Sequence, residues 1–112
     1  FSPWAYYDPH GDCIELFLQP DDFIAQRLDR WVTVYHSRAT GVIVGSQIKN
    51  LQELLTEYPG LSFYIRDRDQ VRISAILGGP ASRQSDEEKF RVYESIMEQA
   101  DKSRLRIAHL VA

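Results

Sequence analysis

The chain lacks the features that mark disulfide-stabilised and membrane-spanning proteins. Its single cysteine, Cys13, excludes an internal disulfide, and its place in a β-rich stretch predicts a buried, unreactive thiol. No apolar run approaches the roughly 18 residues that a membrane-spanning helix needs, and no basic segment followed by an apolar stretch opens the sequence. We therefore expect a soluble, cytoplasmic protein.

The sequence also has no excess of basic residues. The 13 Lys and Arg stand against 16 Asp and Glu, which gives a formal net charge of -3. This balance disfavours attraction of nucleic acid or of an anionic membrane by the protein as a whole. With 112 residues, 44% of them hydrophobic, the chain has the length and the apolar content for a single domain with one core.

The first half of the sequence has the pattern of an antiparallel meander. Residues 4–7 and 12–18 are rich in β-formers and flank Asp8-Pro9-His10-Gly11, so a tight hairpin is predicted. Proline fixes φ in this turn, and glycine permits a positive φ. Further strands are expected at residues 23–28, 31–36 and 42–49.

Helical periodicity begins after the last of these strands. Asn50 is a favourable N-cap, Glu53 completes a capping-box pattern, and leucines recur at helical spacing up to Pro59-Gly60. This pattern predicts a short helix for residues 51–58. A second capping box at Ser85 and Glu88 opens the longest predicted helix. Its buried stripe is expected to contain Phe90, Tyr93, Ile96, Met97 and Ala100.

A second hairpin and a closing strand are expected in the rest of the chain. Residues 61–65 and 70–77 are rich in β-formers and flank a charged turn at residues 66–69. Residues 78–82, which read Gly-Gly-Pro-Ala-Ser, are the most loop-like segment, and residues 105–111 are expected to form the last strand.

This order of elements predicts an α+β domain. We expect a mainly antiparallel sheet of about six to eight strands with about two helices packed on one face. An open sheet has edge strands with unpaired backbone groups, which favour pairing with a second copy of the chain or with a protein partner.

The densest polar cluster lies in and after the first hairpin turn. Asp8, His10 and Asp12, with Glu15 nearby, could bind a divalent metal or supply an acid and a base. The alternative is turn chemistry alone, because tight turns favour aspartate and glycine and a turn histidine is solvated. No cofactor is expected. A dyad of Cys13 with His36 or His109 lacks any surrounding nucleophile motif.

Arginines gather around the second predicted hairpin. Arg66, Arg68 and Arg72 lie near Phe63 and Tyr64, a combination that suits phosphate contacts and base stacking. Acidic residues are interleaved with them, which favours a solvated strand face instead.

Aromatic residues are crowded into the first sheet. Trp4, Tyr6, Trp31 and Tyr35 exceed what one face of a small core needs, and aromatic residues on sheets are favoured anchors of protein interfaces. Their alternative place is the core beneath the helices.

The first hairpin, the later strands and the short helix together match a known pattern. The matching segments are Tyr7-Asp8, Asp12, Ile14-Glu15-Leu16, Trp31-Val32-Thr33-Val34, Gly41-Val42-Ile43-Val44-Gly45, Ile48 and Leu51 to Leu55. On these segments residues 6–58 resemble a small bacterial family known only as a domain of unknown function. Its members are often encoded beside toxin-like genes, which implies an antitoxin-like role, and no catalytic residues come with the family.

The chain departs from this family in two places. Gln47 stands where the family usually has an acid, and residues 59–112 form an extension, predicted as hairpin, helix and strand. The sequence as a whole favours a non-enzymatic protein-interaction module, antitoxin-like or regulatory. The alternatives are a metal-binding protein or enzyme that uses the Asp8/His10/Asp12 turn, and a nucleic-acid-binding regulator that uses the arginines.

Overall fold

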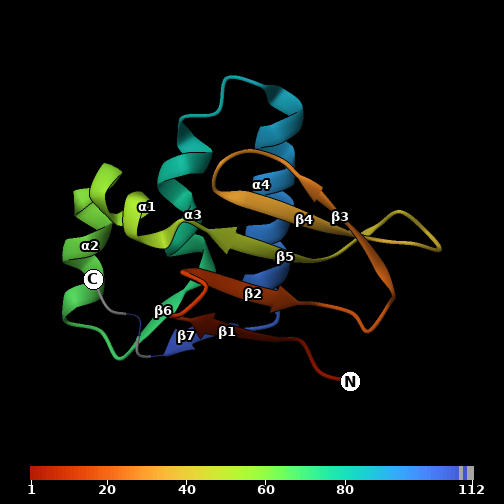
Figure 1. Cartoon of the computed structure of the whole chain (residues 1–112), viewed down its shortest axis with the longest axis horizontal. Helices are drawn as coiled ribbons and strands as arrows, with labels where there is room; N and C mark the ends of the chain where they lie inside the picture. Colours follow the sequence, from red (N-terminus) through yellow and green to blue (C-terminus); the bar gives the residue numbers. More distant parts are fainter. Residues whose placement is uncertain (109, 111–112) are drawn as a thin grey trace.

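Seven strands and four helices make up the part of the chain that the computed structural model describes, residues 1–108 and 110 (Figure 1). The strands are β1 (Trp4–Asp8), β2 (Cys13–Phe17), β3 (Phe23–Arg27), β4 (Val32–Ser37), β5 (Ile43–Lys49), β6 (Gln70–Arg72) and β7 (Arg106–Ala108). The helices are α1 (Leu51–Glu57), α2 (Pro59–Arg66), α3 (Ile73–Ser82) and α4 (Glu87–Lys102). The α+β class predicted from the sequence is confirmed.

The strands form two sheets, where the sequence predicted one. Five strands lie in the order β1-β2-β5-β4-β3 with antiparallel neighbours, and β6 pairs with β7 in a separate two-stranded sheet. The hairpin of β1 and β2 is confirmed, but the predicted meander is wrong because β2 pairs with β5 and not with β3. Strands β2 to β5 therefore have the Greek-key order. The pairing sets Ile14 opposite Ile48, so that apolar side chains share one face.

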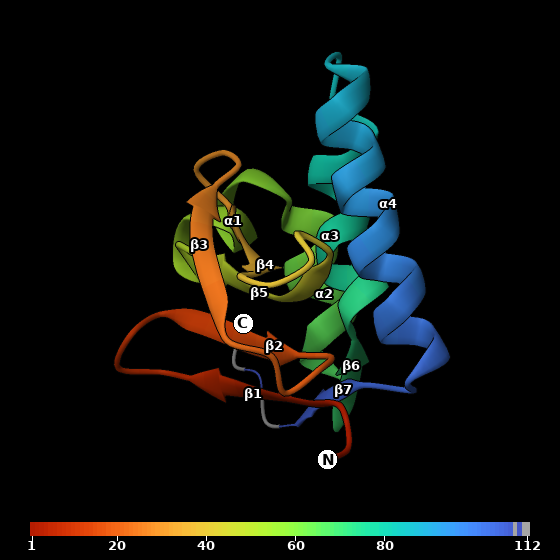
Figure 2. The same ribbon diagram turned by 90° about the vertical axis from the view of Figure 1, so that its right-hand side faces the viewer.

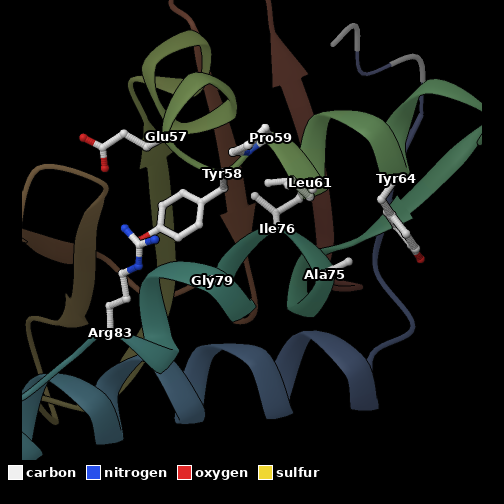
Figure 3. Close-up of a pocket in the computed structure, with 10 residues that line it drawn as sticks. Glu57, Tyr58, Pro59, Leu61, Tyr64, Ala75, Ile76, Gly79 and Arg83 are labelled. Carbon is white, nitrogen blue, oxygen red and sulfur yellow. The ribbon is translucent and has the colours of Figure 1, made fainter.

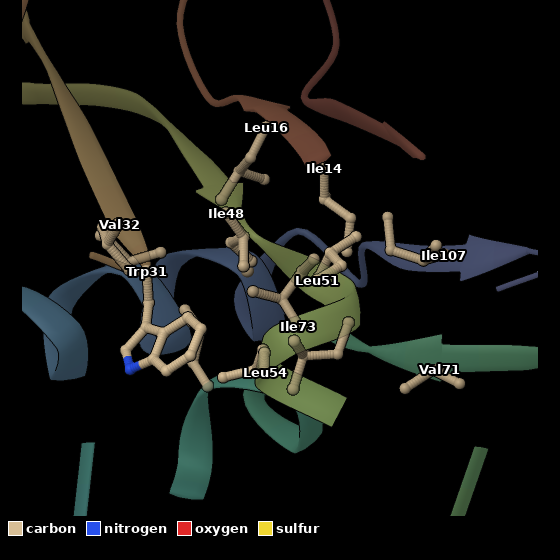
Figure 4. Close-up of a cluster of buried hydrophobic side chains, with 14 of the residues drawn as sticks. Ile14, Leu16, Trp31, Val32, Ile48, Leu51, Leu54, Val71, Ile73 and Ile107 are labelled. Atoms are coloured by element: carbon tan, nitrogen blue, oxygen red, sulfur yellow. The ribbon is translucent and has the colours of Figure 1, made fainter. Parts of the chain in front are cut away.

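Helices cover only one face of the five-stranded sheet. In Figure 2, β3, β4 and β5 lie on one side and α3 and α4 on the other. Alternate residues of β2, β4 and β5 point to this side and are buried, as period-2 patterning requires. They join residues of all four helices and of β6 and β7 in one hydrophobic cluster, part of which appears in Figure 4. Both halves of the chain thus share one core.

The first helix begins where the sequence predicted, but a different residue caps it. Asn50 has a left-handed backbone with φ 56°, and its side-chain amide donates to the Arg30 carbonyl oxygen at 2.6 Å. The carboxylate of Asp12, distant in sequence, accepts the backbone N–H of Gln52 at 3.1 Å. Glu53 pairs with Arg30 instead of completing a capping box.

The predicted second hairpin is wrong. Pro59 lies in the first turn of α2, a position that suits proline because no helical N–H is needed there. Residues 73–82 form α3, and the Gly-Gly-Pro segment expected to be a loop lies within this helix. Gly79 packs so closely against the Tyr58 ring that a Cβ would lie 2.6 Å from Cδ1. Tertiary contacts therefore outweigh the β propensity of residues 61–65 and the loop propensity of glycine.

The last helix agrees closely with its pattern. Asp86, one residue after the predicted Ser85, is the N-cap and accepts the backbone N–H of Glu88 at 2.9 Å. Three members of the expected stripe are buried, Met97 is half-buried, and Phe90 is 37% exposed. The closing strand is β7, although the predicted range also includes residues that lie outside the described part. Among the helices of that part, none has the length and apolar character to cross a membrane.

Candidate functional site

Five aromatic rings form a continuous row on the face of the five-stranded sheet that no helix covers. Trp4 stacks on Tyr6 and on Phe17, with ring centroids 5.3 and 4.9 Å apart. Tyr35 stacks on Phe17 at 5.7 Å and on Phe23 at 4.2 Å. None of these five rings belongs to the core cluster. The row is therefore a second apolar layer, which faces away from the helices.

The strand register brings these rings together. Trp4 lies opposite Phe17, and both Phe17 and Tyr35 pair with Gly45 of β5. Because glycine has no side chain, the two rings meet above its backbone. A Cβ at this position would lie 2.5 Å from the Leu16 carbonyl oxygen and 3.0 Å from Cδ2 of Tyr35. Aromatic neighbours that cover a strand glycine compensate for its missing side chain.

Burial makes the Tyr35 hydroxyl and the Cys13 thiol unreactive. The Tyr35 hydroxyl donates to Oε1 of Glu15 at 2.5 Å, and burial together with this bond raises the pKa of Tyr35 above its ordinary value. Burial, assisted by the Glu15 carboxylate, also raises the pKa of the Cys13 thiol. Cys13 is therefore a poor nucleophile, because thiolate and not thiol attacks.

The four interface candidates from the sequence lie in different environments. Trp4 and Tyr6 are 45% and 44% exposed, whereas Tyr35 is buried by its neighbours in the row. Trp31 lies in the core cluster and does not belong to the row. The Trp31 side chain does not follow the alternation of the two faces along β4. Trp31 lies in the turn before this strand, where the Asp29 carboxylate accepts its backbone N–H at 2.8 Å.

Three rings of the row, those of Trp4, Phe17 and Phe23, border a hollow of about 550 Å³. Its walls are four aromatic residues, the polar loop that precedes β3, and one arginine that follows β4: Phe1, Trp4, Phe17, Phe23, Gln19, Pro20, Asp21, Asp22 and Arg38. Asp21 accepts a hydrogen bond from the Ser37 hydroxyl at 2.9 Å. The hollow thus places two carboxylates beside aromatic faces.

The sequence contained a signal for one of the two members of the row that the prediction missed. Phe17 alternates with Leu16 and therefore faces away from the core. The place of Phe23 could not be inferred in this way, since it depends on the pairing of β3 with β4 and on the bulge at Tyr35/His36.

The polar residues of the first turn make structural contacts. The Asp8 carboxylate accepts the His10 backbone N–H at 3.0 Å, and the Asp12 carboxylate caps α1. In residues 1–108 and 110, no group of three or more His, Cys, Asp and Glu side chains is placed to hold a metal ion. The His36 ring contacts the Gly41 carbonyl oxygen at 3.1 Å and lies on the helix-covered face, opposite to Cys13. His109 lies outside the described residues.

The three nucleic-acid candidates lie at the end of α2 and on β6. The guanidinium of Arg68 stacks on the Tyr64 ring at 3.6 Å and donates to the Tyr64 carbonyl oxygen. Arg66 lies 5.9 Å from the Phe63 ring centroid, and Arg72 is exposed on β6. These residues surround a helix end and not the predicted hairpin turn.

A second concavity lies between α2 and α3 (Figure 3). It has a volume of about 530 Å³ and a largely apolar lining that includes Tyr58, Leu61, Tyr64 and Ile76. The sequence prediction missed this groove, because it placed a hairpin where the two helices form.

Comparison of the chain with protein-family models, with curated proteins and with solved structures gave no match. The resemblance of residues 6–58 to a bacterial family therefore stays a prediction.

Proposed function

We propose that the protein is a non-enzymatic protein-interaction module that binds its partner through the aromatic row. The observation that carries this proposal is the row itself: five stacked rings outside the core on a sheet face that no helix covers. Aromatic side chains supply large contact areas at low entropic cost and dominate the energetic centres of protein interfaces. Trp4 and Tyr6 are the exposed members and hence the expected anchors.

Charge in the hollow favours a basic partner. Two carboxylates, those of Asp21 and Asp22, stand against one guanidinium, that of Arg38, in the lining of the hollow. A lysine or arginine side chain of a partner gains from both a carboxylate and an aromatic face. The net charge of -3 adds a weak attraction for a positively charged partner. An antitoxin-like neutralisation of a basic protein agrees with this chemistry, whereas phosphate groups would be repelled by the two carboxylates.

Photocrosslinking tests the proposal. The benzoylphenylalanine crosslinker replaces Tyr6 in one protein and Phe63, which is 69% exposed on α2, in a matched control. In cells that encode the chain, we expect one basic protein to be crosslinked from position 6 and not from position 63. With the two purified proteins, Trp4→Ala should weaken binding by about tenfold or more, as anchor residues do. Equal crosslinking from both positions, or unchanged affinity in the Trp4→Ala protein, would contradict the proposal.

Self-association along β3 is a second candidate. This strand is an outer edge of the sheet, and Ile24 is 52% exposed on it. Antiparallel pairing of two copies centred on Ala25 would set Phe23 opposite Arg27 of the second copy, which favours a cation–π contact. Molecular mass from sedimentation equilibrium tests it. A dimer that Ala25→Pro converts to monomer is the expected result, and a monomer at every concentration would exclude it.

A further inference from the structure

We infer that the groove between α2 and α3 binds an aliphatic carboxylate, with Arg83 holding the carboxylate and the apolar walls holding the chain. This site lies on helices, separate from the aromatic row, and does not depend on the proposed function. Three observations carry the inference: the apolar lining, the fixed position of Arg83, and the charge at the mouth of the groove.

The walls of the groove suit a hydrocarbon chain. Ile76, which is 1% exposed, and Leu61 approach each other from α3 and α2, as Figure 3 shows. Gly60 also lines the groove and leaves it wide, since a Cβ added there would meet no atom within 4 Å. Its volume of about 530 Å³ lies within the range of small-molecule sites.

The position of Arg83 is set by the ring below it. The guanidinium carbon lies 4.7 Å from the centroid of Tyr58, and Figure 3 shows both side chains at one end of the groove. Tyr58 in turn rests on Gly79, where an added Cβ would lie 2.6 Å from the ring. This stacking orients a planar donor that suits a carboxylate in two-bond geometry.

One guanidinium at this end of the groove has no acidic partner. Glu57 lies at the same mouth, and its carboxylate pairs at 3.0 Å with Arg30, which also pairs with Glu53. Arg83 itself makes no ion pair within the described part of the chain. An apolar channel with an uncompensated guanidinium at one end is complementary to an amphiphile with a negative head.

The length of the groove limits the length of the hydrocarbon chain that it can hold. Ala75 and Arg83 both line it and are eight residues apart on or at the end of α3, which corresponds to about 12 Å of helix. An extended hydrocarbon of about eight to ten carbons covers that length. Decanoate is therefore the appropriate probe.

Amide chemical shifts of the full chain test the inference. Sodium decanoate below its micellar concentration should cause saturable shifts centred on Gly60, Ile76, Gly79 and Arg83. Decanol, which has the same chain without the charge, should bind about tenfold or more weakly, and acetate should not saturate.

Two variants, with Arg91→Gln as a control, distinguish binding of the carboxylate head from binding of the hydrocarbon tail. Arg83→Gln should weaken decanoate binding about tenfold and leave decanol unchanged, whereas Arg91→Gln, on the exposed face of α4, should change neither. Gly60→Leu should weaken both ligands; a Cβ at this position meets no atom within 4 Å, so the variant is expected to fold.

Three results would overturn the inference. They are the absence of saturable decanoate binding, saturable shifts confined to the aromatic row, and equal decanoate affinity of the Arg83→Gln protein and the unmodified chain. The spectrum of each variant without ligand shows whether it is folded, so loss of binding and loss of structure are distinguished.

Discussion

At the scale of single residues, Gly45 decides how the uncovered face of the sheet is built. A side chain here would press on the Leu16 carbonyl oxygen and on the Tyr35 ring. We expect Gly45→Ala to lower the free energy of unfolding by about 1–3 kcal/mol, the usual cost of overpacking. Urea unfolding measures it. Gly60→Ala is the control, because that site is open. Equal stability of both variants would mean that the rings do not meet above Gly45.

Tyr93 and Asp29 form a second decisive contact. The Tyr93 hydroxyl donates to Asp29 Oδ2 at 2.6 Å, and Asp29 also accepts the backbone N–H groups of Trp31 and Val32. One carboxylate thus ties the turn before β4 to α4. Burial, and then this hydrogen bond, raise the pKa of Tyr93 above its ordinary value of 10.0.

This pKa shift predicts a loss of stability at alkaline pH. The native state keeps the Tyr93 proton where the unfolded chain loses it, so the contribution is complete below pH 10.0 and declines as pH rises further. The free energy of unfolding should fall by about 1.4 kcal/mol per pH unit for each such tyrosine. Tyr93→Phe should make this slope shallower in urea unfolding between about pH 10 and 11.5. An unchanged slope would contradict the role of Tyr93.

At the scale of elements, the first turn of α1 is capped by a residue that is distant in the sequence. The sequence predicted a capping box within residues 50–53, but the cap comes from Asp12 at the start of β2. Propensity and local motifs describe neighbours along the chain, and they cannot detect a partner 40 residues away. The helix itself was predictable because its leucines repeat at helical spacing.

The cap can be tested by substitution at both positions. Asp12→Ala should cost about 1–2 kcal/mol, from the lost cap and from the left-handed backbone at φ 52°. Asp12→Asn retains an acceptor and tolerates that backbone, so it should cost less. Asn50→Gly should cost less than Asp12→Ala, since glycine favours the left-handed backbone at this position and the variant loses only the hydrogen bond from the Asn50 amide to the Arg30 carbonyl oxygen. Thermal unfolding measures all three. A larger loss for Asn50→Gly than for Asp12→Ala would support the local capping box.

At the scale of the whole molecule, the two halves of the chain share one core. Ile14, Val32 and Ile48 from the sheet are fully buried, and they belong to the same cluster as Ile76 and Ile96 from the last two helices. The segment of residues 6–58 is therefore not expected to be a self-sufficient unit, because its inner sheet face would be exposed to water.

A fragment comparison tests this dependence. Residues 1–58 alone should give a poorly dispersed amide spectrum, and the whole chain should unfold in a single cooperative transition. Addition of residues 59–112 as a separate fragment should restore dispersion if the core is the only link. A well-dispersed spectrum of residues 1–58 alone would show that the first half folds independently.

The sequence by itself determined the elements whose side chains repeat with a clear period. The hairpin of β1 and β2, strands β3 to β5, α1 and α4 follow from alternation, helical spacing and turn residues, which depend on neighbours in the chain. Tertiary structure alone decided the pairing of β2 with β5, the helical state of residues 59–66 and 73–82, and the sorting of Trp31 into the core and Trp4 onto the surface. These outcomes depend on which apolar faces cover one another, and that is a property of the folded molecule and not of any short segment.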